Sequence, residues 1–174
     1  MKNIRLMIIM LFAAFASCSM ADDNGSDDLD ATYATQMLQT GTDAPAFALP
    51  TVNGDTIALA DYKGKYVVLD FWASWCPDCQ KVLPTMVEAY NSYKDKAAFL
   101  GVSFDNDKET LQKAIEKYGL KYPQVSEFKA WKETAIKTSY QIKWIPGFYI
   151  VNPQGKIELA TVEITKIEKF LQNL

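Results

Sequence analysis

The sequence predicts a layered α/β domain with a mixed central β-sheet, and three observations lead to this fold class. Two short runs, residues 66–72 and 97–104, are almost continuously apolar, as strands covered on both faces are. A segment with apolar residues at helical spacing follows each run. A strand–turn–strand pattern over residues 147–160 and a last amphipathic segment complete the chain. This order of elements is typical of helices packed on a sheet.

Composition limits both the size and the chemistry of the protein. The chain has 174 residues, 22% charged and 49% hydrophobic, with a formal net charge of −3, which fits one globular domain. No basic patch stands out, which argues against a nucleic-acid partner held through phosphates. The chain lacks histidine, which excludes Ser-His-Asp triads, Cys-His proteases and His-ligated metals. Its single arginine, Arg5, lies in the predicted leader, so bidentate arginine recognition is excluded too.

Residues 1–17 are typical of a secretory signal peptide. Lys2 and Arg5 give a positive start, and residues 6–15 form an apolar run too short to cross a hydrocarbon layer of ~30 Å. Small residues then precede Cys18, an order that resembles the lipobox of bacterial lipoproteins, in which this cysteine carries lipid. The alternative is an ordinary signal peptide with an incidental cysteine. We expect Cys18 to be lipidated, which anchors the protein to a membrane without spanning it.

The number of cysteines agrees with an exported protein. Three cysteines leave one odd thiol, which needs an explanation in an oxidising compartment. Lipidation of Cys18 would explain the odd cysteine, and Cys76 and Cys79 would then remain as a pair. Without residues 1–17 the chain carries 16 positive and 21 negative charges, a net charge of −5.

Residues 18–42 are predicted to be the lipid-attachment site and an acidic, flexible tether. Five aspartates lie between Asp22 and Asp30, among few apolar residues, so we expect this segment to be solvated. The acidic run is explained most simply by solubility. It also resembles the surface-export signals of Bacteroidota lipoproteins. The protein is therefore expected in the cell envelope, facing the periplasm or exposed on the outer membrane surface.

The folded domain is predicted to span residues 43–174 and to begin with a β-hairpin extension. Residues 47–51 and 56–59 have strand character and flank Asn53 and Gly54. This dipeptide favours a two-residue type I′ turn.

The central part of the domain is predicted to alternate helix and strand. Apolar spacing predicts a helix over residues 77–93, in which Pro84 predicts a kink. Residues 97–104 form the second buried strand. A second helix is predicted over residues 107–118, with Gly119 as its stop.

The last part of the chain is predicted to hold a helix, a β-hairpin and a final helix. The helix and the two strands are expected over residues 131–140, 147–151 and 156–160. The final helix has an apolar face made of Ile164, Ile167, Phe170 and Leu171. Neither an internal repeat nor a second domain is indicated.

The chemistry is concentrated in Cys76-Pro77-Asp78-Cys79, where a buried strand ends and a helix begins. The N-terminus of a helix carries about half a positive charge, and its unpaired N–H groups point at Cys76. A thiolate there is stabilised, so Cys76 is the expected nucleophile and Cys79, nearly one turn further on, the resolving cysteine. Pro77 and Asp78 are expected to modulate the motif, because the Asp78 carboxylate opposes the helix dipole and raises the pKa of the thiol.

Two other interpretations of the cysteine pair are weaker. A zinc site needs two more ligands, and the folded domain offers neither histidine nor another cysteine. A purely structural disulfide that closes a four-residue loop restrains the unfolded chain very little. We predict a redox-active pair that requires no metal and no cofactor.

The segment VVLDFWASWCPDC resembles the thioredoxin superfamily, and the wider stretch from residue 41 through residues 59–65 resembles its envelope-anchored TlpA/ResA-type branch. Pro84 lies where the family has its kinking proline. Ile145-Pro146 resembles the family's cis-proline loop, which offers backbone groups to an extended substrate. The resemblance implies a thioredoxin-like fold, thiol-disulfide oxidoreductase activity on protein disulfides, and electrons from a membrane thiol donor.

Asp70 is a carboxylate inside an otherwise apolar strand, six residues before Cys76. Desolvation is expected to raise its pKa, so that it exchanges a proton near neutral pH. The corresponding aspartate of thioredoxins assists the resolving cysteine. This implies that Asp70 accepts the Cys79 proton, through water, when the mixed disulfide resolves. The alternative is an aspartate that points to solvent near the end of the strand.

The four tryptophans are expected to divide between the site and the core. By the resemblance, Trp75 flanks the redox pair, and with Ile145-Pro146 it makes up the expected substrate-binding surface. Trp144 is expected to line the same groove. Trp72 and Trp131 are expected to serve in packing.

The competing functions can be separated. The preferred interpretation is a monomeric reductase of protein disulfides in the cell envelope. An oxidase or isomerase would use the same site, and the reduction potential decides between them. A thiol peroxidase is disfavoured, because Ala73 stands three residues before Cys76, where peroxiredoxins have Thr or Ser. A lipid-anchored binding module with an inert disulfide is the last alternative.

Overall fold

The computed structural model describes residues 28–174. The predicted signal peptide, Cys18 and the first part of the acidic segment lie outside the described residues. The described part is an α/β domain built on a five-stranded sheet of order β5-β4-β3-β6-β7, with a separate two-stranded sheet of β1 and β2. Within residues 28–174 no helix has the length and apolar character needed to cross a membrane.

The central sheet is mixed, as predicted. Its strands are β3 (Val67–Trp72), β4 (Ala98–Ser103), β5 (Gln124–Ser126), β6 (Gly147–Val151) and β7 (Ile157–Thr161). Strand β3 pairs in parallel with β4, which pairs in parallel with β5, whereas the β3–β6 and β6–β7 pairs are antiparallel. The helices are α1 (Leu29–Tyr33), the 3₁₀ helix η1 (Leu59–Tyr62), α2 (Pro77–Tyr93), α3 (Lys108–Tyr118), α4 (Ala135–Ser139) and α5 (Ile164–Gln172).

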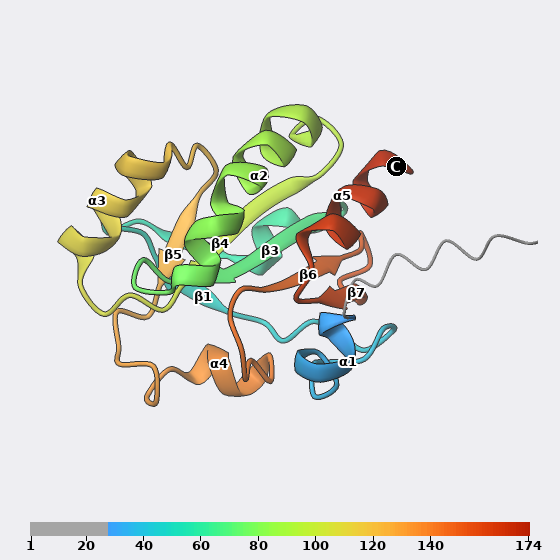
Figure 1. The fold of residues 1–174 in the computed structure, drawn as a ribbon, viewed down its shortest axis with the longest axis horizontal. Helices are drawn as coiled ribbons and strands as arrows, with labels where there is room; N and C mark the ends of the chain where they lie inside the picture. The colour runs from blue at the N-terminus through green and yellow to red at the C-terminus, as the bar shows by residue number, and fades with distance from the viewer. Residues whose placement is uncertain (1–27) are drawn as a thin grey trace, which may run out of the picture.

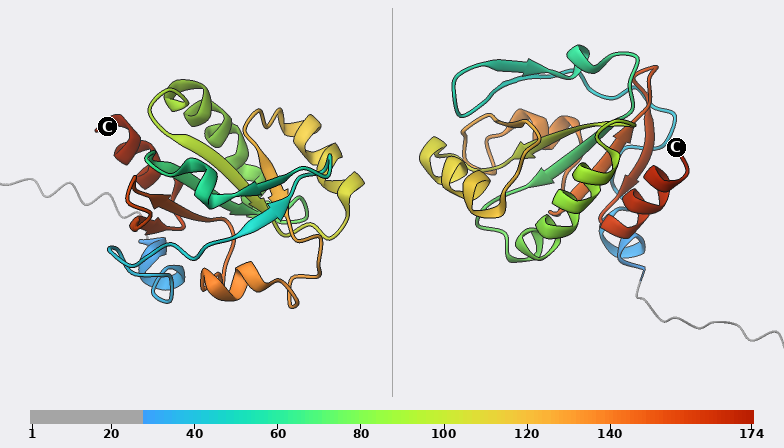
Figure 2. Two further views of the ribbon diagram at one scale, coloured as in Figure 1. Left: turned by 180° about the vertical axis from the view of Figure 1, so that it is seen from behind. Right: turned by 90° about the horizontal axis from the view of Figure 1, so that it is seen from above.

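The sheet is covered on both faces. Helices α2, α3 and α5 lie on one face, and the hairpin of β1 (Ala48–Pro50) and β2 (Thr56–Ala58) lies on the other (Figures 1 and 2). Phe47, beside the hairpin, packs edge-to-face on Tyr140 after α4, with ring centroids 5.9 Å apart. All six residues of the central strand β3 are therefore buried, which explains why it is apolar at every position except Asp70.

The two principal helices form where the sequence predicted them. Helix α2 spans Pro77–Tyr93 and contains Pro84. Helix α3 begins after Asp107, whose carboxylate accepts the Thr110 N–H at 2.7 Å, and ends at Gly119 with a φ of 65°. A side-chain cap at one end and a left-handed glycine at the other define the length of this helix.

The hairpin is confirmed, but the predicted type I′ turn is wrong. That turn needs a positive φ at both central residues, and only Gly54, at 93°, has one. The Thr51 N–H bonds to the Asp55 carbonyl at 2.7 Å, and the Gly54 N–H bonds to the Thr51 carbonyl at 3.1 Å. The loop thus has three residues, so that Asn53 stays in the common half of φ space and Gly54 alone adopts the left-handed conformation.

Two elements between α3 and β6 differ from the prediction. Strand β5 was not predicted, because it has only three residues and two of them are polar. The predicted helix over residues 131–140 shortens to α4, since residues 131–133 form a turn before the N-cap Thr134.

Residues 28–42, predicted to be part of the tether, are ordered on the domain instead. Asp30 accepts hydrogen bonds from the Thr161 hydroxyl and from Lys166 Nζ, each at 2.7 Å, and Met37 is buried. The acidic composition predicted solvation. The partners of Asp30 lie more than 130 residues further along the chain, so composition alone does not reveal them.

Candidate active site

Cys76 and Cys79 are joined by a disulfide at the start of α2, with their Cα atoms 5.3 Å apart. Cys76 is the N-cap residue of the helix, and its Sγ accepts the Cys79 N–H at 3.1 Å. A sulfur in this position takes over one of the free N–H groups of the helix end, which stabilises a thiolate there. Cys76 is 5% exposed and Cys79 is fully buried. Of the two sulfurs, Cys76 is therefore the one that a substrate can reach.

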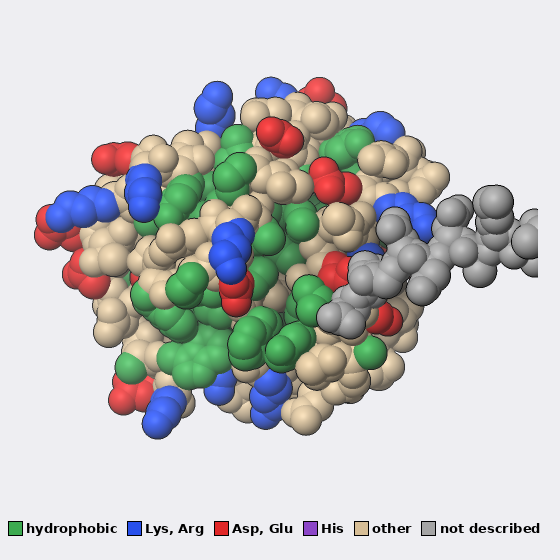
Figure 3. Space-filling view, in the orientation of Figure 1, with side chains coloured by type: hydrophobic (Ala, Val, Ile, Leu, Met, Phe, Trp, Pro, Cys, Tyr) green, Lys and Arg blue, Asp and Glu red, His purple; other side chains and the backbone are tan. Residues whose placement is uncertain are grey.

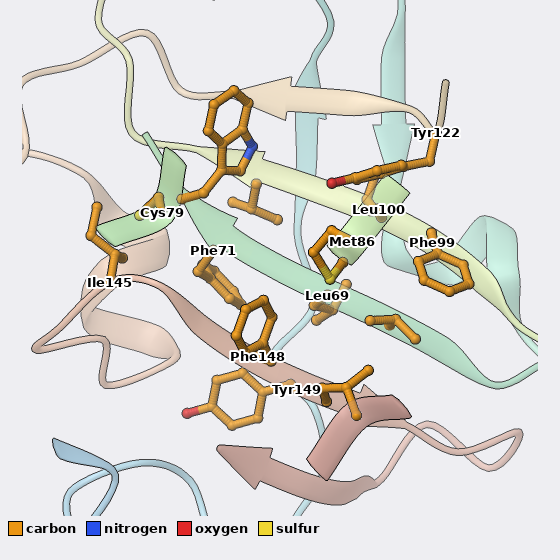
Figure 4. Close-up of a cluster of buried hydrophobic side chains, with 14 of the residues drawn as sticks. Leu69, Phe71, Cys79, Met86, Phe99, Leu100, Tyr122, Ile145, Phe148 and Tyr149 are labelled. Carbon is orange, nitrogen blue, oxygen red and sulfur yellow. The ribbon is translucent and has the colours of Figure 1, made fainter. Parts of the chain in front are cut away.

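The Ile145-Pro146 peptide bond is cis, as the resemblance implied, and lies against the disulfide. The Ile145 carbonyl oxygen is 3.6 Å from Cys76 Sγ. Pairing of β3 with β6, which sets Phe71 opposite Gly147, brings this loop to the edge of the sheet where α2 begins. Figure 4 shows Ile145 next to the start of α2.

Aromatic side chains surround the cysteines on the surface. Trp75 and Trp144 are 54% and 43% exposed. Trp75 packs edge-to-face on Trp131, with centroids 6.0 Å apart, and Tyr33 of α1 stacks on Trp144 at 4.5 Å. Trp72, by contrast, is fully buried. Figure 3 shows hydrophobic side chains gathered around α4 and the start of α2, so the redox pair opens onto an apolar surface.

Asp70 is buried, so the alternative of a solvent-facing aspartate does not describe the structure. It is 1% exposed, and its Oδ2 accepts the Tyr122 hydroxyl at 2.8 Å. Its Oδ1 accepts no hydrogen bond from any group of residues 28–174. Burial raises the pKa of Asp70 to about 7, although the Tyr122 hydrogen bond acts in the opposite direction. Asp70 can therefore gain or lose a proton near neutral pH.

A second buried carboxylate, Asp105, holds the loop in front of Cys76. It accepts the Ser74 N–H at 3.0 Å, the Ser74 hydroxyl at 2.6 Å and the Ser103 hydroxyl at 2.7 Å. The Gln80 side-chain amide of α2 donates to the Ser74 carbonyl at 2.6 Å. The sequence analysis did not single out Asp105. The available signal was its place two residues after β4, at the same edge where Cys76 follows the parallel strand β3.

The two residues between the cysteines lie on the surface. Pro77 is the first residue of α2, a position that tolerates proline because the N–H there has no partner within the helix. The Asp78 carboxylate forms an ion pair with Lys81 at 2.7 Å, and both side chains are more than half exposed. The lysine offsets part of the negative charge that Asp78 brings to the helix N-terminus.

A cysteine pair at a helix N-terminus, next to a cis-proline on a thioredoxin-like sheet, is typical of the class of proteins that carry out thiol-disulfide exchange. Comparison with known proteins agrees. Residues 40–160 match the AhpC/TSA family, and the chain belongs to that family. Over 143 residues it is 32% identical to a thiol-disulfide oxidoreductase ResA of Bacillus cereus, in an alignment that covers 80% of each chain.

Two solved structures support the same assignment. The thioredoxin domain of a thiol-disulfide oxidoreductase from Bacteroides vulgatus aligns with a TM-score of 0.69 and 35% identity, over 77% of this chain and 99% of the other. A thiol:disulfide interchange protein from Bacteroides sp. aligns with a TM-score of 0.71 and 33% identity, over 79% and 90%. The chain is thus a thioredoxin-like thiol-disulfide oxidoreductase.

Proposed function

We propose that this oxidoreductase reduces disulfides of other proteins in the bacterial cell envelope, as a monomer held at the membrane by lipid on Cys18. The observation that carries the reaction is the asymmetry of the pair, in which Cys76 is reachable and Cys79 is not. The extracytoplasmic location is supported by the leader pattern of the sequence. A membrane thiol donor would return the enzyme to its dithiol state after each cycle.

The reaction transfers two electrons in two exchanges. The Cys76 thiolate attacks a substrate disulfide, so that a Cys76–substrate disulfide forms and one substrate sulfur leaves as a thiolate. The Cys79 thiol then loses its proton and attacks Cys76 Sγ, which releases the second substrate thiolate. The substrate is reduced, and the enzyme is left with the Cys76–Cys79 disulfide present in the structure.

Asp70 is proposed as the acceptor of the Cys79 proton, through water. Two features support this role: the pKa of about 7 and the free Oδ1 atom. Asp70→Asn should slow decay of the mixed disulfide while leaving the first attack by Cys76 unchanged. Equal single-turnover rates for the two proteins at every pH would reject the role.

The substrate is proposed to bind as an extended segment beside Cys76. The Ile145 carbonyl oxygen lies 3.6 Å from Cys76 Sγ, and this oxygen is placed to accept an N–H from the substrate backbone. The exposed Trp75 ring gives the segment an apolar surface on the other side.

The function is tested first by trapping and turnover. Cys79→Ser should accumulate a mixed disulfide with insulin or with a peptide disulfide, and Cys76→Ser should accumulate none. Wild-type protein should reduce insulin when dithiothreitol supplies the electrons. A disulfide that dithiothreitol reduces slowly, with no insulin turnover, would instead support an inert, structural pair.

The direction of electron flow is tested by the reduction potential of the Cys76–Cys79 pair, measured by equilibration with glutathione or dithiothreitol. A reductase requires a value near about −270 mV. A value of roughly −120 to −180 mV would make the protein an oxidase or isomerase. The anchor has a separate test, because Cys18→Ser should abolish incorporation of an alkyne-tagged fatty acid.

A further inference from the structure

A chain of buried polar groups crosses the three neighbouring strands β3, β4 and β5. Trp72 Nε1 donates to Gln124 Oε1 at 2.9 Å, and Gln124 Nε2 donates to the Tyr122 carbonyl at 3.3 Å. The Tyr122 hydroxyl in turn donates to Asp70 Oδ2 at 2.8 Å. Gly101 of β4 lies between Asp70 and Gln124. It pairs with Asp70 of β3 on one side and with Gln124 of β5 on the other. We call these residues the polar strip.

Tyr122 is held rigidly within the polar strip. Its side chain is buried and packs against Tyr90 of α2 and Phe99 of β4, with ring centroids 5.5 and 6.1 Å away. Figure 4 shows the ring reaching back over the sheet from the start of β5. Because the ring is enclosed on these sides and its backbone carbonyl is bonded to Gln124, the hydroxyl has a fixed position.

The hydrogen bond from Tyr122 makes the two oxygens of Asp70 unequal. Oδ2 accepts the Tyr122 hydroxyl, and Oδ1 is buried with no partner within the described part of the chain. An unpartnered buried oxygen costs free energy, and a functional purpose is one explanation for its being retained. The exchange of a proton with a resolving thiol is such a purpose, because the accepting oxygen must be free.

We propose that Tyr122 is a positioning residue of the redox site, which fixes the Asp70 carboxyl group so that one oxygen is held and the other is left free to take up the proton of Cys79. The proposal rests on the role proposed above for Asp70. It assigns a part in the reaction to a residue 46 positions after Cys76, outside the redox motif and the cis-proline loop.

The surroundings of Asp70 make Tyr122 the group that tunes it. Helix α2 buries Cys79, Leu83, Met86 and Ala89, β4 presents Gly101, and β6 presents Phe148. Among these groups Cys79 alone titrates, so no buried lysine or second carboxylate competes with Tyr122. Burial, and then the nearby Asp70 charge, raise the pKa of Tyr122 well above its usual value, so the hydroxyl stays a donor throughout the working pH range.

The test is Tyr122→Phe in the full-length chain. The hydroxyl stabilises the charged form of Asp70, so its loss should move the midpoint of the Asp70 titration upward by roughly one pH unit. That midpoint is measured by NMR of the ¹³C-labelled carboxyl group, identified by its absence in Asp70→Asn. The rate of mixed-disulfide resolution should fall several-fold at pH 7 and recover at higher pH, with the first attack unchanged.

The matched control is Tyr149→Phe, which removes a buried hydroxyl bonded to the Tyr140 carbonyl at 2.7 Å. This variant should lose stability without moving the Asp70 midpoint. In an Asp70→Asn background, Tyr122→Phe should have no further effect on resolution. Site-specific 3-fluorotyrosine at position 122 is a stronger hydrogen-bond donor than tyrosine and keeps the aromatic ring in place. It should lower the midpoint of the Asp70 titration.

The outcomes separate this proposal from the one on which it rests. An unchanged Asp70 midpoint in Tyr122→Phe, or a resolution rate that is lowered equally at every pH, would overturn the positioning role. A shifted midpoint with normal resolution in both Tyr122→Phe and Asp70→Asn would instead reject Asp70 as the proton acceptor. It would leave the contact with Tyr122 intact.

Discussion

The two buried carboxylates of the site have opposite surroundings. Asp70 and Asp105 are each 1% exposed, and they belong to adjacent parallel strands or the residues just after them. Asp105 accepts three hydrogen bonds, from Ser74 and Ser103, whereas Asp70 accepts one, from Tyr122. A saturated carboxylate fixes the atoms around it. A carboxylate with a free oxygen keeps the ability to bind a proton.

The largest effect is expected where the saturated carboxylate is removed. Asp105→Ala leaves the Ser74 N–H and two hydroxyl groups buried without their acceptor, which should lower the free energy of unfolding by about 4 kcal/mol. Insulin reduction should fall at all pH values, because the loop in front of Cys76 loosens. Urea unfolding at pH 7 measures the first effect. The control is Asp107→Ala, which removes the exposed N-cap side chain of α3. It should lower the free energy of unfolding by about 1 kcal/mol.

A loss below that of the Asp107 control would show that Asp105 does not support the loop, and the contrast between the two carboxylates would fail.

A smaller effect, of opposite sign, is expected at the carboxylate with a free oxygen. The folded-state pKa of Asp70, about 7, lies above the value of 3.8 expected for the unfolded chain. Between these values the unfolded chain holds fewer protons, so stability decreases as pH rises from about 4 to 7 and is flat above. Asp70→Asn removes this dependence and should stabilise the protein by about 3 kcal/mol at pH 6.

At pH 4.5 the same substitution should stabilise the protein by only about 1 kcal/mol, because this pH lies less than one unit above the pKa of Asp70 in the unfolded chain. Unfolding curves of the two proteins from pH 4.5 to 8.5 measure the difference. Parallel pH dependences would mean that Asp70 titrates alike in the folded and unfolded states.

The smallest of these effects is expected at Gly101 and Gln124 in the polar strip. A methyl group at Gly101 would overlap Gln124 Oε1, so Gly101→Ala should cost about 2 kcal/mol. Gln124→Ala alone should also destabilise, since Trp72 Nε1 loses its acceptor. In the double variant the overlap is gone, so a double-mutant cycle should give a favourable coupling. Additive losses would show that the two side chains do not compete for the same space.

The sequence predicted the parts of the fold that local patterns determine. Strands β3 and β4 are almost continuous apolar runs, and α2 and α3 carry helical spacing with clear ends, so they form as expected. The redox pair was equally visible, because a strand, a Cys-x-x-Cys motif and a helix follow one another within the chain.

The sequence did not reveal what depends on distant partners. Asp70 and Tyr122 are 52 residues apart, and no local pattern indicates that the one donates to the other. Strand β5 is too short to show a periodic pattern in the sequence. It contributes Gln124 to the polar strip only through its pairing with β4. Likewise, Tyr33 lies in a segment whose composition predicted a tether, although its ring stacks on Trp144.

The missing side chain at Gly101 has a consequence for how this protein can diverge. Gln124 occupies the volume that a residue with a β-carbon at position 101 would need. Descendants of this sequence can therefore enlarge position 101 only after position 124 has shortened, and that change deprives the indole of Trp72 of its acceptor. Substitutions at positions 72, 101 and 124 are therefore expected to occur in a preferred order and to covary among related sequences.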